Sequence, residues 1–249
     1  MKKIWFSFFI LWFLGLCTGL AQQPVYVMVH GAWGGAWQFA AVDRMMEESG
    51  VGVHRVQLTG LGERYHLAHR EVDLDLHIED VVNTILFEGL DAVVLVGHSY
   101  GGMVITGVAD RIPEKIQKLI YLDAFLPEND QSVFDLVDQA ERMTLENNVR
   151  DGFIIPAWAK QETTLPRDMP QPLATLTQRI ALKNSEQRLG IPSVFILTVD
   201  HTESIEEDAF FPFYERAKAY GWTTSLMVAD HNPQRSNPEE LATILLNER

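Results

Sequence analysis

Short runs of apolar residues recur along the chain and alternate with segments whose apolar positions follow a helical period. Six runs are too short for a helix and rich in β-branched residues, and they lie at 25–30, 51–58, 92–97, 116–122, 193–199 and 223–228. The intervals between them predict helices over 80–88, 101–111, 208–220 and 238–247. Continuous apolar strands that alternate with helices are typical of a parallel sheet covered on both faces. The pattern therefore predicts an α/β fold with a mostly parallel sheet of about six strands and helices on both faces.

One interval, from 124 to 190, is far longer than a crossover helix between parallel strands requires. It is rich in proline and also contains Phe134, Phe153 and Trp158. An insertion of this kind, placed where the chain leaves a strand, is a candidate cap or lid over a pocket. A peripheral helical layer without a gating role is the alternative, and the sequence leaves both open.

The first 21 residues have the organisation of a secretory signal. Two lysines open the chain, an apolar run over 4–16 follows, and small residues stand at Gly19 and Ala21. We expect cleavage after Ala21, which leaves one domain over 22–249 and a secreted or periplasmic protein. A membrane anchor is disfavoured because the apolar run is shorter than the roughly 20 residues that a spanning helix needs.

Charge and metal-binding residue types limit the possible partners. The chain has 34 acidic and 20 basic side chains, which argues against nucleic acid and favours a neutral or apolar ligand. The one cysteine, Cys17, lies in the signal, and the bulky Leu16 before it makes lipid attachment the less favoured reading. Glu63, His66 and His69 lack a helical frame and a further ligand, so no metal or other cofactor is expected.

The segment 93–102 joins a buried strand to a helix through the sequence Gly97-His98-Ser99-Tyr100-Gly101. Between a strand and a helix, Gly-x-Ser-x-Gly holds its serine on a strained turn that lifts the hydroxyl above the sheet edge. Glycine is needed on both sides because a side chain there would clash with neighbouring backbone. The pentapeptide alone occurs by chance, but this setting predicts that Ser99 is a nucleophile.

A nucleophilic serine needs a base and an acid that orients the base. His231 follows the last apolar run and precedes a helix, which suits the chain order serine, acid, histidine. Asp123 and Asp200 each end an apolar run ahead of it, and catalytic groups collect at the carboxyl ends of parallel strands. From the residues alone, either aspartate can be the acid.

The loop after the first strand, 30–37, is rich in glycine, so its backbone can approach a substrate closely. We assign the two oxyanion-binding amides to Ala32 in this loop and to Tyr100 after the nucleophile. The residues expected around the substrate pocket are His30, Gly31, Trp33, His98 and Phe125.

Six stretches carry a family resemblance: VHGAWGGAW at 29–37, LTGLGERYHL at 58–67, DLDLHIEDVV at 73–82, VLVGHSYGGMVITGVADRIPE at 94–114, YLDAFLPE at 121–128 and PQPLATL at 170–176. Together they resemble bacterial esterases of the α/β-hydrolase fold, akin to the plant methylesterase and hydroxynitrile lyase group. The resemblance implies that fold, and it favours Asp123 over Asp200 as the acid. The lyase branch has threonine in place of Gly31 and lysine in place of Asn232, so the resemblance implies an esterase.

We therefore expect a serine hydrolase that cleaves carboxylic esters of hydrophobic or aromatic small molecules through an acyl-enzyme. A lactonase or carbon–carbon bond hydrolase with the same triad is one alternative. A non-catalytic ligand-binding protein on the same scaffold is another, although it has no need of an intact Ser99 and His231. The sequence indicates no oligomeric state.

Overall fold

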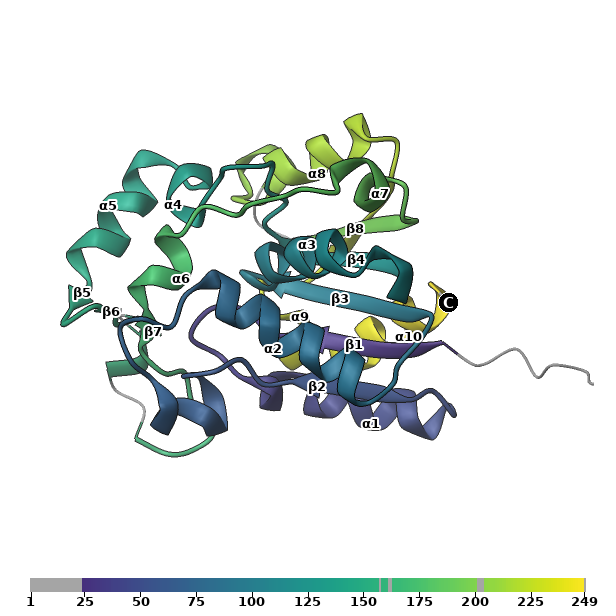
Figure 1. Cartoon of the computed structure of the whole chain (residues 1–249), viewed down its shortest axis with the longest axis horizontal. Helices are drawn as coiled ribbons and strands as arrows, with labels where there is room; N and C mark the ends of the chain where they lie inside the picture. Colours follow the sequence, from purple (N-terminus) through teal and green to yellow (C-terminus); the bar gives the residue numbers. More distant parts are fainter. Residues whose placement is uncertain (1–23, 157, 161–162, 201–203, 249) are drawn as a thin grey trace, which may run out of the picture.

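A six-stranded sheet forms the centre of the computed structural model, which describes residues 24–156, 158–160, 163–200 and 204–248 (Figure 1). The strand order is β2-β1-β3-β4-β8-β9, and every neighbouring pair is parallel. The strands are β1 (Val25–Val29), β2 (Val53–Val56), β3 (Val93–Ser99), β4 (Ile116–Ala124), β8 (Ser193–Val199) and β9 (Thr223–Val228). Each strand falls on one of the six apolar runs, so the predicted α/β fold is confirmed.

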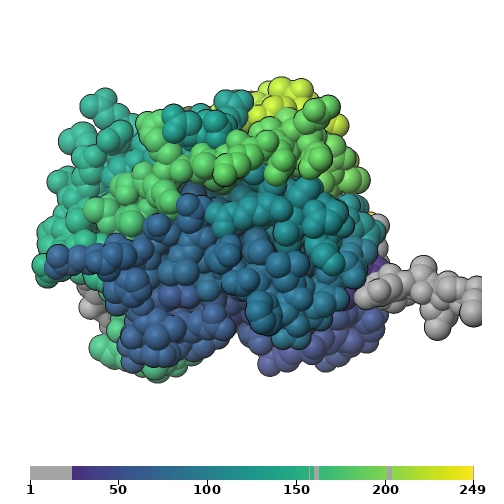
Figure 2. Space-filling model, in the orientation of Figure 1, coloured from purple at the N-terminus to yellow at the C-terminus, as the bar shows by residue number. Residues whose placement is uncertain are grey.

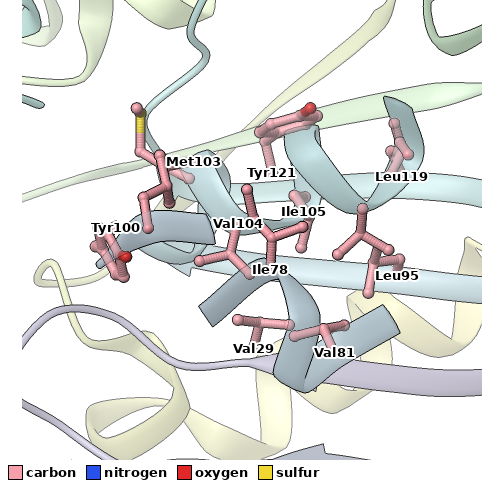
Figure 3. Close-up of a cluster of buried hydrophobic side chains, with 14 of the residues drawn as sticks. Val29, Ile78, Val81, Leu95, Tyr100, Met103, Val104, Ile105, Leu119 and Tyr121 are labelled. Atoms are coloured by element: carbon pink, nitrogen blue, oxygen red, sulfur yellow. The ribbon is translucent and has the colours of Figure 1, made fainter. Parts of the chain in front are cut away.

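The two faces of this sheet pack into two separate cores, because successive side chains of a strand point to opposite sides. In β1, for example, Val27 and Val29 belong to one core and Tyr26 and Met28 to the other. The helices that cover the first face are α2 (Leu74–Phe87), α3 (Gly101–Arg111) and α8 (Phe211–Ala219), and those on the second are α1 (Ala40–Glu48) and α10 (Pro238–Asn247). Figure 3 shows the first core, where side chains of α2 and α3 meet those of β3 and β4.

Helix boundaries differ from the expected ones where side chains cap the helix. Helix α2 begins at Leu74, ahead of the expected residue 80, because the Asp73 carboxylate accepts a hydrogen bond from the Leu76 amide at 2.9 Å. Helix α1 was not predicted, since Val42 and Met46 are the only large apolar side chains that it buries. Short 3-10 turns occupy Ala36–Phe39, Gly62–Leu67, Pro113–Lys115, Trp158–Lys160 and Ile205–Glu207, and a four-residue helix, α9 (Pro233–Ser236), precedes α10.

Between β4 and β8 the chain forms an insertion, most of which gathers beyond the carboxyl ends of the strands, on the left of Figure 1. Its elements are α4 (Val133–Leu136), α5 (Gln139–Asn147), β5 (Val149–Arg150), β6 (Phe153–Ile154), β7 (Gln171–Pro172), α6 (Leu173–Thr177) and α7 (Ser185–Leu189). The three strands form a small antiparallel sheet, which the sequence pattern did not predict because each strand has only two residues. In Figure 2 the teal and green atoms of the insertion form one continuous surface with the blue segment that contains α2.

Three hydrogen bonds at Trp33 join the insertion to the loop that follows β1. The Met169 amide donates to the Trp33 carbonyl oxygen at 2.7 Å, and the Trp33 amide donates to Gln171 Oε1 at 2.9 Å. The Trp33 indole also donates to the Ile154 carbonyl oxygen at 3.1 Å. These contacts place the insertion directly over the strand ends, while its movement as a lid stays a prediction.

Two expectations concern the start of the chain and the membrane. The signal over 1–21, with Cys17, lies outside the described residues. Among the residues that the structure describes, no helix combines the length and the apolar character that crossing a bilayer requires.

Candidate active site

Ser99 ends β3 with a φ of 54°, in the left-handed region that most side chains avoid. This conformation reverses the chain between β3 and α3 and is held by close packing of the glycines around it. A Cβ on Gly101 would lie 2.7 Å from the Val29 carbonyl oxygen, and one on Gly97 would lie 2.6 Å from the Gly101 carbonyl oxygen. The backbone of β1 therefore lies close enough to α3 that only glycine fits at the contact.

Ser99, His231 and Asp123 form a continuous hydrogen-bonded chain. The Ser99 Oγ and the His231 Nε2 are 3.0 Å apart, and the His231 Nδ1 and the Asp123 Oδ2 are 2.6 Å apart. A carboxylate can only accept, so Nδ1 carries the proton and Nε2 is free to receive the proton of the Ser99 hydroxyl. This is the arrangement in which an imidazole acts as a general base toward a serine.

The choice between the two aspartates follows from the strand order. Strand β4 pairs directly with β3, with Ser99 opposite Ala124, so Asp123 lies beside Ser99. Its carboxylate is buried, and its Oδ1 accepts a hydrogen bond from the Thr198 amide at 3.1 Å. Asp200 follows β8, one strand further from β3, and its side chain is exposed. The structure thus brings Asp123 to the imidazole of His231.

Two aromatic rings flank the imidazole of His231. The Phe210 ring stacks on it with a centroid distance of 4.9 Å and an interplanar angle of 7°. The His98 ring lies 4.7 Å away, and the His98 Nε2 donates to the main-chain carbonyl oxygen of His231 at 2.6 Å. Burial, together with the nearby His231, holds the pKa of His98 well below its ordinary value, so His98 stays neutral.

The amides of Ala32 and Tyr100 are available to an oxyanion. Both residues line the cavity at Ser99, and neither amide has a hydrogen-bond acceptor within the part of the chain that the structure describes. The Tyr100 side chain is fixed because its hydroxyl donates to the His77 Nδ1 at 3.0 Å, while the His77 Nε2 donates to the Thr59 carbonyl oxygen at 2.8 Å. Burial lowers the pKa of His77 to about 4, which keeps the ring in the neutral form that this pattern needs.

Two cavities meet at Ser99. The larger, of about 580 Å³, has a mostly apolar wall that includes Trp33, Phe125, Val133, Leu136, Val137, Leu145, Trp158, Leu176, Phe210 and Pro212. The smaller, of about 340 Å³, is lined by Gly31, Ala32, Trp33, Gln38, His98, Ser99, Trp158, Asp168, His231, Asn232 and Arg235. Four of the five residues expected around the pocket therefore line one or both of these cavities.

The fifth, His30, differs from its expected place because it is fully buried behind the loop and lines neither cavity. Its Nδ1 donates to the Gly31 carbonyl oxygen at 2.8 Å, and its Nε2 accepts from the Leu58 amide at 3.3 Å. Burial lowers the pKa of His30 to about 4. His30 thus shapes the loop from behind.

Sequence reasoning missed Phe210, Gln38, Asp168 and Arg235. Phe210 and Arg235 stand in or beside helices, and Asp168 lies in the insertion, so no motif marked them. Only the position of Arg235, four residues after His231, could have suggested that it lies near the site. Among the described residues, no group of three His, Cys, Asp or Glu side chains is arranged to hold a metal ion.

Comparison with known proteins agrees with this geometry. A carbendazim hydrolyzing esterase of Nocardioides sp. (strain SG-4G) is 34% identical over 232 residues, which covers 87% of this chain and 96% of that protein. Methylesterase 8 of Arabidopsis thaliana is 27% identical over 245 residues, covering 89% of this chain and 88% of its own length. The expected resemblance to bacterial esterases and plant methylesterases is thereby confirmed.

Solved structures and the family profile support the same assignment. An extracellular α/β-hydrolase from a Paenibacillus species has a TM-score of 0.76 to this chain at 21% identity, over 90% of this chain and 98% of that one. At that identity the likeness establishes the fold alone. The profile of the alpha/beta hydrolase family matches residues 26–244. The chain belongs to the alpha/beta hydrolase family.

Proposed function

We propose that this protein is a carboxylic ester hydrolase that works through an acyl-enzyme on Ser99. The observation that carries the proposal is the hydrogen-bonded chain Ser99–His231–Asp123, with contacts of 3.0 and 2.6 Å, at the wall of a cavity of about 580 Å³. The names of the two similar proteins, an esterase and a methylesterase, support the reaction class.

The geometry supplies each step of the reaction. The His231 Nε2 takes the hydroxyl proton while the Ser99 Oγ attacks the carbonyl carbon, and the amides of Ala32 and Tyr100 donate to the oxygen that becomes negative. The C–O bond to the alcohol then breaks as the imidazolium returns its proton to the leaving oxygen. Water repeats the sequence on the acyl-enzyme, which releases the acid and restores the serine. Asp123 keeps Nδ1 protonated throughout and stabilises the imidazolium.

The larger cavity indicates the class of ester. Its wall is mostly apolar, and its aromatic side chains, Trp33, Phe125, Trp158 and Phe210, offer flat surfaces to a ring or an alkyl chain. Apart from Tyr100 and His231, the ionisable side chains among the described residues of its wall are carboxylates, which disfavour an anionic group: Asp138, Glu141, Glu206, Glu207 and Asp208. An uncharged, hydrophobic or aromatic substituent fits this cavity best.

The test is turnover of a panel of p-nitrophenyl esters, from acetate to octanoate and benzoate, together with labelling by a fluorophosphonate. We expect turnover by the wild-type protein, covalent labelling at Ser99, and loss of both in Ser99→Ala. The matched control is Ser49→Ala, an exposed serine in a distant turn, which should behave as wild type. No turnover of any ester and no label at Ser99 would overturn the proposal and favour a ligand-binding role.

We also propose that the protein is exported and cleaved after Ala21, which rests on the lysines, apolar run and small residues of the first 21 positions. Intact-mass analysis of the protein from the medium or periplasm should give a chain that begins at Gln22. A chain that keeps residues 1–21 and stays with the cells would contradict this.

A further inference from the structure

The smaller cavity opens onto the same nucleophile as the larger one. Ser99 and His231 line both, and so do the rings of Trp33 and Trp158, which lie edge to face with centroids 5.3 Å apart. An ester whose carbonyl carbon lies at Ser99 has two substituents, one on each side of the carbonyl. The geometry therefore offers each substituent a cavity of its own.

The chemistry of the smaller cavity is different from that of the larger one. Arg235, Asp168, Gln38 and Asn232 contribute to its wall, and among these are a cation, an anion and two amides. Among the described residues that line the larger cavity, His231 is the one basic side chain. A wholly apolar group in the smaller cavity would displace water from these polar side chains and return no hydrogen bond, which costs free energy.

Arg235 is placed to meet a ligand. It projects from α9, and its guanidinium lies over the Trp37 ring at 5.2 Å from the centroid. Within residues 24–156, 158–160, 163–200 and 204–248 no carboxylate forms an ion pair with it. The residue lines the smaller cavity, so the N–H donors of its guanidinium that face the cavity can bind an acceptor there.

Asp168 supplies the opposite kind of group. Its Oδ2 accepts from the Trp158 indole at 2.8 Å, which fixes the carboxylate beside the wall that the two cavities share. Its Oδ1 is 3.5 Å from the Gln38 Nε2, a long contact that leaves most of the acceptor capacity of this oxygen unused. Gln38 itself is buried, and its Oε1 has no hydrogen-bond partner among the described residues.

We propose that the smaller cavity is a subsite for a polar, uncharged substituent of the ester, one that both accepts from Arg235 and donates to Asp168, such as a secondary amide. The inference rests on the proposed ester hydrolysis and makes it more specific. The preferred substrate is then an asymmetric ester, with an apolar substituent in the larger cavity and an amide-bearing substituent in the smaller one.

The test compares esters that differ in the polar group alone. One pair joins 4-phenylbutanoate to 2-acetamidoethanol or to pentanol, and the reversed pair joins 4-phenylbutanol to 3-acetamidopropanoate or to hexanoate. We expect kcat/KM for the amide ester to exceed that of its apolar partner by about tenfold or more in one of the two pairs, because a charged side chain supplies each hydrogen bond. The pair that responds identifies which half of the ester occupies the subsite.

Variants separate this subsite from general effects on the enzyme. Arg235→Met and Asp168→Ala should each bring the amide-to-apolar ratio close to one, and the ratio cancels any effect that a variant has on both esters alike. Arg235→Lys should retain part of the preference. Arg44→Met is the matched control, because Arg44 is an exposed arginine on α1 that lines neither cavity, and it should keep the full ratio.

Two results would contradict the inference in distinguishable ways. If p-nitrophenyl acetate is hydrolysed but neither pair shows a preference for the amide ester, or if both variants keep that preference, the proposed subsite is refuted and the proposed ester hydrolysis is not. If the wild-type protein hydrolyses none of these esters, the proposed function fails and the subsite fails with it.

Discussion

Replacing Asp123 with asparagine changes the charge of the side chain that faces His231 and leaves its size almost unchanged. The side chain is buried, with 1% of its surface exposed, so water cannot take the place of the lost carboxylate. The asparagine oxygen can still accept from the Thr198 amide, as the Asp123 Oδ1 does at 3.1 Å. We therefore expect the fold to stay the same, with the perturbation confined to the contact between residue 123 and the imidazole of His231.

The size of the effect follows from the hydrogen bond at the other oxygen, where the Asp123 Oδ2 lies 2.6 Å from the His231 Nδ1. An amide NH₂ group at that place donates, so Nδ1 must give up its proton and accept. The proton then sits on Nε2, where it blocks transfer from the Ser99 hydroxyl 3.0 Å away. Loss of the correct tautomer and of the negative charge should lower kcat about 10,000-fold, equivalent to about 5.5 kcal/mol of transition-state stabilisation.

The assay is steady-state turnover of p-nitrophenyl butyrate by wild type, Asp123→Asn and Asp200→Asn, with circular dichroism to compare their folds. Asp200→Asn is the matched control, and its kcat should stay within about threefold of wild type. Full turnover by Asp123→Asn together with an inactive Asp200→Asn would refute the reasoning, because it would assign the acid to the exposed strand end of β8.

Three further outcomes are expected. Phe210→Leu should lower kcat about two- to tenfold, since the ring that stacks on the imidazole of His231 is lost. Phe210→Tyr should keep kcat near the wild-type value, and equal effects of the two substitutions would contradict this prediction. Gly31→Ala should lower kcat about tenfold in the same assay, because the new Cβ would lie 3.0 Å from the Cβ of Ser99. Unchanged turnover would contradict this, because it would mean that the turn at Ser99 can shift without loss of activity. His30 and His77 titrate near pH 4 when folded and near 6.5 when unfolded, so the unfolded chain binds more protons between these values and stability falls as pH is lowered. The free energy of unfolding, measured with urea, should fall by about 2 kcal/mol per histidine from pH 7 to about 5. His77→Gln should reduce this dependence on pH, and a urea midpoint that does not change with pH would contradict the prediction.

The sheet and the turn at Ser99 could be predicted because their signals are local. A buried parallel strand shows as an uninterrupted apolar run, and a strand followed by Gly97-His98-Ser99-Tyr100-Gly101 and a helix leaves the chain few conformations. The insertion was harder, because two-residue strands such as β5 and β6 carry no period and form only when the chain folds back on itself. The position of His231 after the last strand was likewise readable, since it depends on chain order.

The sequence by itself determined the parallel sheet, the strained turn at Ser99 and the family, each of which depends on residues that are close together along the chain. The tertiary structure decided which aspartate meets His231, because both end a strand and only the strand order places Asp123 beside β3. It also decided the chemistry of the smaller cavity, where Gln38, Asp168 and Arg235 come from three distant segments. Contacts of that kind leave no pattern in the sequence, because they arise only when the insertion, the loop after β1 and α9 pack around one point.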